Sequence, residues 1–98
     1  GHIAAIEYLS NNRPSFVSLN LGTGLKTSVL DLISTFEIVN KVKIPYKICK
    51  ERIGDTAFLL ASNAKAMDIL NWEFKNSLED MCRDGWKFVL KNLNYLKL

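Results

Sequence analysis

Cysteine is scarce in this 98-residue sequence, and the two cysteines present, Cys49 and Cys82, lie far apart. Neither belongs to a Cys-x-x-Cys pair, the spacing that metal sites and redox motifs commonly use. This scarcity argues against a disulfide-stabilised scaffold and against a structural zinc site. We therefore expect two reduced, half-buried thiols in a cytoplasmic protein.

Histidine and long apolar runs are also in short supply. The single histidine, His2, has no evident Ser, Cys or Asp partner for triad chemistry. No apolar run approaches the roughly 18 residues that a membrane-spanning helix needs, and no secretory leader is evident. With 48% hydrophobic and 23% charged residues, the composition is typical of a globular protein. We expect no membrane partner and no metal.

Positive charge is present but is not concentrated. The formal net charge is +3, and the Lys and Arg residues are spread along the whole chain. A protein that binds nucleic acid more often gathers its cations on one element or face. The charge pattern therefore argues against a nucleic-acid partner.

The hydrophobic pattern predicts four helices and two or three short strands. Thr27 or Ser28 caps the clearest helix, with Asp31 completing a variant capping box. Ser77, followed by acidic residues, opens the last helix. The predicted helices are 2–10, 28–40, 63–70 and 77–92, and the predicted strands are 16–20, 45–50 and 57–61. The pattern indicates an α/β or α+β architecture. Because two or three strands are few for an autonomous sheet, we expect the sheet to continue in chain outside this sequence.

Two motifs resemble cofactor or catalytic signatures and fail on inspection. Gly22-Thr-Gly24 precedes a predicted helix, but residue 27 is Thr, so the third glycine of a dinucleotide fingerprint is missing. We predict a tight turn with positive φ there, and a turn that borders a ligand is the alternative. Tyr46-x-x-x-Lys50 matches a catalytic pair that requires a helix. Pro45 favours a strand instead, on which the two residues lie about 13 Å apart.

The polar cluster with the clearest chemical rationale is Arg52-Ile-Gly-Asp55. The planar guanidinium of Arg52 suits a diphosphate, and Asp55 can accept hydrogen bonds from sugar hydroxyl groups. The alternative is an exposed loop with a surface ion pair, which contributes little stability.

The chain as a whole resembles the UDP-glucose 4-epimerases. The segment from Leu19-Asn-Leu-Gly-Thr-Gly24 to Ser28-Val-Leu-Asp31 resembles an Asn-Leu-Gly-x-Gly…Ser-Val-Leu-Asp segment of that family. Arg52-Ile-Gly-Asp55 falls where the family has Arg-x-Gly-Asp, and Leu70-Asn-Trp72 and Ser77-Leu-Glu-Asp80 continue the match. The order and spacing of these motifs over the full chain carry the resemblance. Ile53 departs from the Pro that is common in the family.

The resemblance implies that residues 1–98 are the incomplete, C-terminal UDP-sugar-binding domain of an extended short-chain dehydrogenase/reductase. The N-terminal Rossmann half would be absent. The parent enzyme would be an isomerase of galactose metabolism that interconverts UDP-glucose and UDP-galactose with bound NAD. By similarity, Arg52 would contact the UDP diphosphate, Asp55 the ribose and Val29 the uracil, while Leu59 would border the sugar pocket.

The resemblance assigns no catalytic, cofactor-binding or metal-binding residue to the chain itself. The sequence has no glycine-rich NAD loop and no helical Tyr/Lys pair, so we expect it to be inactive alone. Two alternatives stay open. One is an interaction module that self-associates, for example as a homodimer. The other is the same domain of a related nucleotide-sugar dehydratase or reductase.

Overall fold

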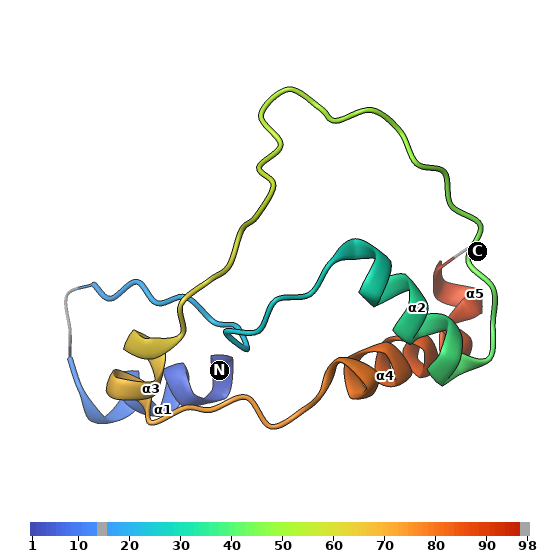
Figure 1. Ribbon diagram of the computed structural model, residues 1–98. Helices are drawn as coiled ribbons and strands as arrows, with labels where there is room; N and C mark the ends of the chain where they lie inside the picture. The colour runs from blue at the N-terminus through green and yellow to red at the C-terminus, as the bar shows by residue number, and fades with distance from the viewer. Residues whose placement is uncertain (14–15, 97–98) are drawn as a thin grey trace. The chain divides into compact units, whose positions relative to one another are not determined.

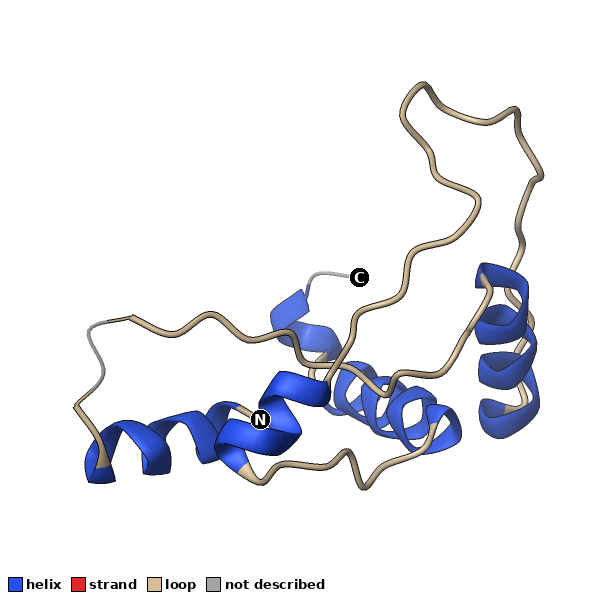
Figure 2. Ribbon diagram, turned by 60° about the vertical axis from the view of Figure 1, so that its left-hand side comes forward, coloured by secondary structure: helices blue, strands red, loops and turns tan. Residues whose placement is uncertain are grey.

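The computed structural model describes residues 1–13 and 16–96, and this part of the chain is built from helices joined by loops (Figures 1 and 2). In chain order the helices are α1 (His2–Asn11), α2 (Val29–Asn40), α3 (Ala64–Leu70), α4 (Leu78–Lys91) and α5 (Leu93–Leu96). The four helices predicted from the sequence are confirmed to within one or two residues at their ends. The short helix α5 follows directly after α4 and was not predicted.

The two longest helices begin where the capping signals placed them. Ser28 is the N-cap of α2, where its hydroxyl accepts the Asp31 backbone N–H and the Asp31 carboxylate accepts the Ser28 backbone N–H. Ser77 and Asp80 form the same reciprocal arrangement at the start of α4. Each capping box satisfies two backbone groups that the first turn of a helix leaves without an intrahelical partner.

The predicted strands are the part of the fold that the structure does not confirm. Segments 16–20, 45–50 and 57–61 are loops, and the described residues contain no strand. An extended segment becomes a strand only when a neighbouring segment pairs with its backbone N–H and C=O groups, and otherwise these groups bind water. The described chain is therefore helical, and the predicted α/β or α+β sheet is not confirmed.

The chain forms two compact units, each described by itself. Unit 1 comprises Gly1–Lys26 and Ile53–Lys75, and unit 2 comprises Thr27–Arg52 and Asn76–Leu98. Unit 1 contains α1 and α3, which contact each other. Unit 2 contains α2, α4 and α5, and α2 packs across α4 (Figure 1). A single domain over residues 1–98 stays a prediction.

The centre of unit 2 is an aromatic contact between its two long helices. The rings of Phe36 and Trp86 meet edge to face, with centroids 5.7 Å apart and planes at 75°. One turn further along α2, Asn40 Nδ2 donates a hydrogen bond of 3.1 Å to the Cys82 carbonyl oxygen. Cys82 is buried, whereas Cys49 is exposed, and both thiols are free. The expectation of free thiols is confirmed, but the expectation that both are half-buried is wrong.

The chain exposes far more surface than a compact protein of its size. Its accessible surface is 8862 Å², whereas a folded monomer of 11.1 kDa exposes roughly 5,700 Å². Ala66 and Cys82 are the buried apolar residues of the described chain. Many large apolar side chains on α1, α2 and α4 therefore face solvent.

Among the described residues, no helix combines the length and the apolar character required to cross a bilayer.

Candidate functional site

The candidate polar cluster lies on an exposed turn. Gly54 has φ +92°, in the left-handed region that disfavours residues with a side chain. A Cβ atom added to Gly54 would meet nothing within 4 Å, so the backbone conformation rather than space calls for glycine here. Arg52 and Asp55 flank this turn, and both are exposed. Neither side chain is therefore buried in the interior of the chain.

The four predicted substrate-binding residues divide equally between the two units. Val29, the first residue of α2, and Arg52 belong to unit 2, whereas Asp55 and Leu59 belong to unit 1. The two apolar members are strongly exposed, Val29 at 73% and Leu59 at 90%. A large exposed apolar side chain is not explained by packing within the chain. The exposure of all four is compatible with ligand contact, and their individual roles stay predictions.

The glycine turn before α2 behaves as a structural turn. Gly24 has φ +71°, which confirms the prediction of positive φ at this turn. The hydroxyl oxygen of Thr23 accepts the Leu25 backbone N–H at 3.1 Å and closes the turn locally. A Cβ atom on Gly22 would lie 3.6 Å from Ala61 Cβ, so this glycine lies against the loop that precedes α3.

Tyr46 and Lys50 do not form the helical catalytic pair that their spacing imitates. Both are exposed residues of the loop that follows α2. Without a helix, residues four apart in sequence are not brought to one face. The segment is a loop rather than the predicted strand, and the absence of a catalytic role for this motif stays a prediction.

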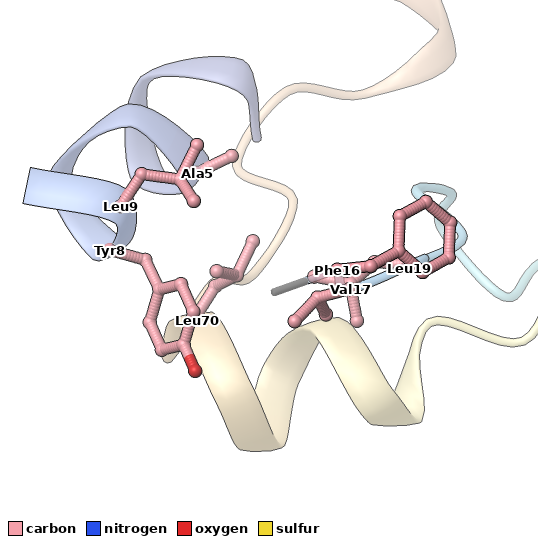
Figure 3. Close-up of a pocket in the computed structure, with 7 residues that line it drawn as sticks. All are labelled: Ala5, Tyr8, Leu9, Phe16, Val17, Leu19 and Leu70. Atoms are coloured by element: carbon pink, nitrogen blue, oxygen red, sulfur yellow. The ribbon is translucent and has the colours of Figure 1, made fainter. Parts of the chain in front are cut away.

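Unit 1 also contains an apolar hollow of about 260 Å³ (Figure 3). Its lining residues are Ala5, Tyr8 and Leu9 of α1, Phe16, Val17 and Leu19 of the following loop, and Leu70 of α3. These residues provide no charged group to bind a diphosphate, which requires cations or clustered N–H donors. The hollow is therefore a different feature from the predicted nucleotide site.

The carboxylates with lowered pKa values accept hydrogen bonds that stabilise the local structure. The pKa of Asp31 is lowered by the Ser28 hydroxyl and then by the Ser28 backbone N–H. The pKa of Glu37 is lowered chiefly by the Ile44 backbone N–H, which it accepts at 2.8 Å, with Lys43 adding a smaller effect. These hydrogen bonds hold helix ends and a turn. Among the described residues, no group of three or more His, Cys, Asp or Glu is placed to hold a metal ion.

One contact was not foreseen from the sequence. Lys26 Nζ lies 4.6 Å from the centroid of the Phe58 ring, within the distance of a cation–π interaction. The two residues are 32 positions apart, and nothing in the local pattern of either one signals the other. Such pairings become visible only in three dimensions.

No family model matches the chain, but curated proteins match it over nearly all its length. A bifunctional UDP-glucose 4-epimerase and UDP-xylose 4-epimerase 3 of Arabidopsis thaliana is 43% identical over 93 residues, covering 94% of this chain and 26% of the relative. UDP-glucose 4-epimerase 3 of Oryza sativa subsp. japonica is 45% identical over 93 residues, covering 94% and 25%. UDP-glucose 4-epimerase of Bacillus subtilis (strain 168) is 40% identical over 97 residues, covering 99% and 28%.

The chain thus spans about a quarter of the length of the curated relatives that it matches. Identity of 40–45% over 92 residues or more is high enough to indicate common descent. The chain is therefore a homologue of the UDP-glucose 4-epimerases, and the part of those proteins that it matches is their C-terminal portion.

Proposed function

We propose that this chain is the substrate-side portion of a UDP-glucose 4-epimerase and supplies contacts to the UDP part of a nucleotide sugar. The observation that carries the proposal is the 40–45% identity to UDP-glucose 4-epimerases over more than nine-tenths of the chain. The exposed Arg52 and Asp55, on either side of a turn that requires glycine, give the proposal a chemical basis. A guanidinium is well suited to bind a diphosphate because it offers several N–H donors in a fixed plane.

In this proposal each exposed residue has one role. Arg52 binds the diphosphate, and Asp55 accepts hydrogen bonds from the ribose. Val29 lies against the uracil, where a bare apolar side chain at the start of a helix favours a flat base. Leu59 borders the sugar pocket. The chain contributes binding and not the chemical step, which is assigned to the Rossmann portion of the parent enzyme.

The proposed parent enzyme uses NAD, held by the Rossmann portion rather than by this chain. Hydride exchange with NAD at sugar C4 would interconvert UDP-glucose and UDP-galactose in cytoplasmic galactose metabolism. The role of the chain's own residues is to hold the UDP group so that the sugar is presented to the cofactor. Remote binding of this kind contributes to rate by orienting the reacting group.

The test is a titration of the isotope-labelled chain with UDP-glucose, followed by NMR. We expect shifts confined to the surroundings of Val29, Arg52, Asp55 and Leu59, with weak affinity because the chain is only part of the proposed pocket. Arg52→Met should abolish the shifts. Arg83→Met is the matched control, because Arg83 pairs with Asp80 at the start of α4. Shifts that are unchanged in Arg52→Met would exclude Arg52 as a ligand.

A second candidate function, self-association, is favoured by a different observation. The chain exposes roughly 3,000 Å² more surface than a compact monomer of its mass. Stable interfaces bury about 800 Å² on each partner, so the excess is large enough to be covered by a second copy. Sedimentation velocity at several concentrations should show dimers or larger species. A single monomeric species at every concentration would count against this candidate.

A further inference from the structure

Three contacts join the loop before α2 to residues 58–65, which run from the preceding loop into α3. At one end, Lys65 Nζ donates a hydrogen bond of 3.2 Å to the Ser18 carbonyl oxygen. Further along, Gly22 lies against Ala61, with 3.6 Å between the position of a Cβ on Gly22 and the Ala61 Cβ. As the residue number rises in the first loop, the number of its partner falls. The contacts therefore pair the two segments in antiparallel order, largely through side chains.

Lys26 closes the far end of this pairing. Its Nζ atom lies 4.6 Å from the centroid of the Phe58 ring. A cation over the face of an aromatic ring is attracted by the negative charge of that face. Phe58 is thereby held toward the first loop, and Leu59 is the next residue in the chain.

The exposure of the following side chains alternates as expected for an extended segment. Phe58 is 55% exposed, Leu59 is 90% exposed and Leu60 is 42% exposed. Successive side chains of an extended chain point to opposite sides. With Phe58 held toward Lys26, Leu59 must face away, which is how it reaches its high exposure.

We propose that Lys26 is a positioning residue for Leu59. By holding the Phe58 ring, Lys26 fixes which face of the segment turns outward. Because neighbouring side chains of an extended segment face opposite sides, a rotation that turned Phe58 outward would turn Leu59 inward. Since the proposed function puts Leu59 at the border of the sugar pocket, the pairing decides whether a leucine or a bulkier phenylalanine meets the sugar. The consequence for the sugar rests on the proposed function, whereas the positioning of Leu59 by Lys26 does not depend on it.

The experiment compares two substitutions of Lys26 in the full chain by NMR without ligand. Lys26→Met keeps most of the apolar stem and removes the charge, whereas Lys26→Arg keeps a cation that can lie over the ring. We expect Lys26→Met to shift the NMR signals of the Leu59 methyl groups and the Phe58 ring and to increase hydrogen exchange at residues 56–60. We expect Lys26→Arg to give the same Phe58 and Leu59 signals as the unaltered chain. Lys75→Met is the control, because it removes an exposed lysine of the same unit.

A second variant gives a direct signature of the contact. In the unaltered chain the ring current of Phe58 should move the Lys26 Hε signals upfield, and Phe58→Leu should return them to their ordinary position. If Lys26→Met leaves the Phe58 and Leu59 signals unchanged, or if Arg perturbs them as much as Met, the positioning role is wrong. UDP-glucose titration of the unaltered chain tests the proposed function separately. Failure there leaves the positioning result intact and removes only its consequence for the sugar.

Discussion

Two serine residues decide where the long helices begin. In each case the hydroxyl oxygen accepts a backbone N–H three residues on, and an aspartate carboxylate accepts the backbone N–H of the serine. Ser77→Ala should destabilise the first turn of α4 by about 1 kcal/mol, because the Asp80 backbone N–H loses the hydroxyl oxygen that accepts it. Backbone NMR shifts of residues 78–82 should move toward coil values. Ser62→Ala is the control, because the N-cap of α3 is Asn63 rather than Ser62. Equal effects of the two substitutions would contradict the capping role.

The same caps predict how the helices respond to acid. The pKa of Asp31 lies below its ordinary 3.8 because of its bonds to Ser28. The pKa of Asp80 is lowered first by the Ser77 backbone N–H. A carboxylate whose pKa is lower in the folded state stabilises it above the unfolded pKa, and this contribution is lost as the pH falls through the folded pKa. Helix content measured by far-UV circular dichroism should therefore stay constant as the pH is lowered to about 3.8, and it should decrease at lower pH. Asp80→Asn should flatten part of this fall, and an acid-insensitive signal would contradict the prediction.

An aromatic contact contributes to the packing of α2 against α4. Edge-to-face rings contribute beyond the area that they bury, and Trp86 is half-buried against Phe36. Trp86→Ala should cost about 2 kcal/mol, below the range of a fully buried tryptophan. Urea denaturation measures the loss, and Trp86→Phe should recover much of it. Lys87→Ala changes the next, exposed residue of α4 and should have little effect. A loss in Lys87→Ala as large as in Trp86→Ala would mean that the ring contact does not hold the helices.

Helices and strands differed in how well the sequence predicted them, for a physical reason. The start of α2 is determined by four consecutive residues, because Ser28 and Asp31 form a capping box with each other. Segment 57–61 has the composition of a strand, but a strand also needs a hydrogen-bonded neighbour, whose position in the chain the segment itself does not specify. The exposed loop that was the alternative for Arg52-Ile-Gly-Asp55 is found, because Gly and Asp are frequent in turns and loops. The Lys26–Phe58 contact was not readable, because it joins residues 32 positions apart.

The large accessible surface of the chain can be compared with the greater length of its relatives. An excess of roughly 3,000 Å² over a compact monomer is what a domain would expose if its natural cover were a further part of the same protein. The relatives are about four times as long as the matched part of this chain. Both observations support the proposal that this chain is one portion of a longer enzyme. The exposed hollow of unit 1 is one place where such a cover would find apolar partners.

The same surface predicts how sharply the chain unfolds. The urea m-value is proportional to the surface exposed on unfolding. With 8862 Å² already exposed in the folded chain and roughly 16,000 Å² when extended, unfolding exposes roughly seven-tenths of what a compact protein of equal mass exposes. We therefore expect an m-value lower in that proportion, measured by circular dichroism at concentrations where sedimentation shows a monomer. Adding the N-terminal portion of a related epimerase should raise the m-value of the joint transition, because covered surface is then exposed on unfolding. An m-value equal to that of a compact 98-residue protein would mean that the isolated chain already buries a full core, which would remove the need for a cover.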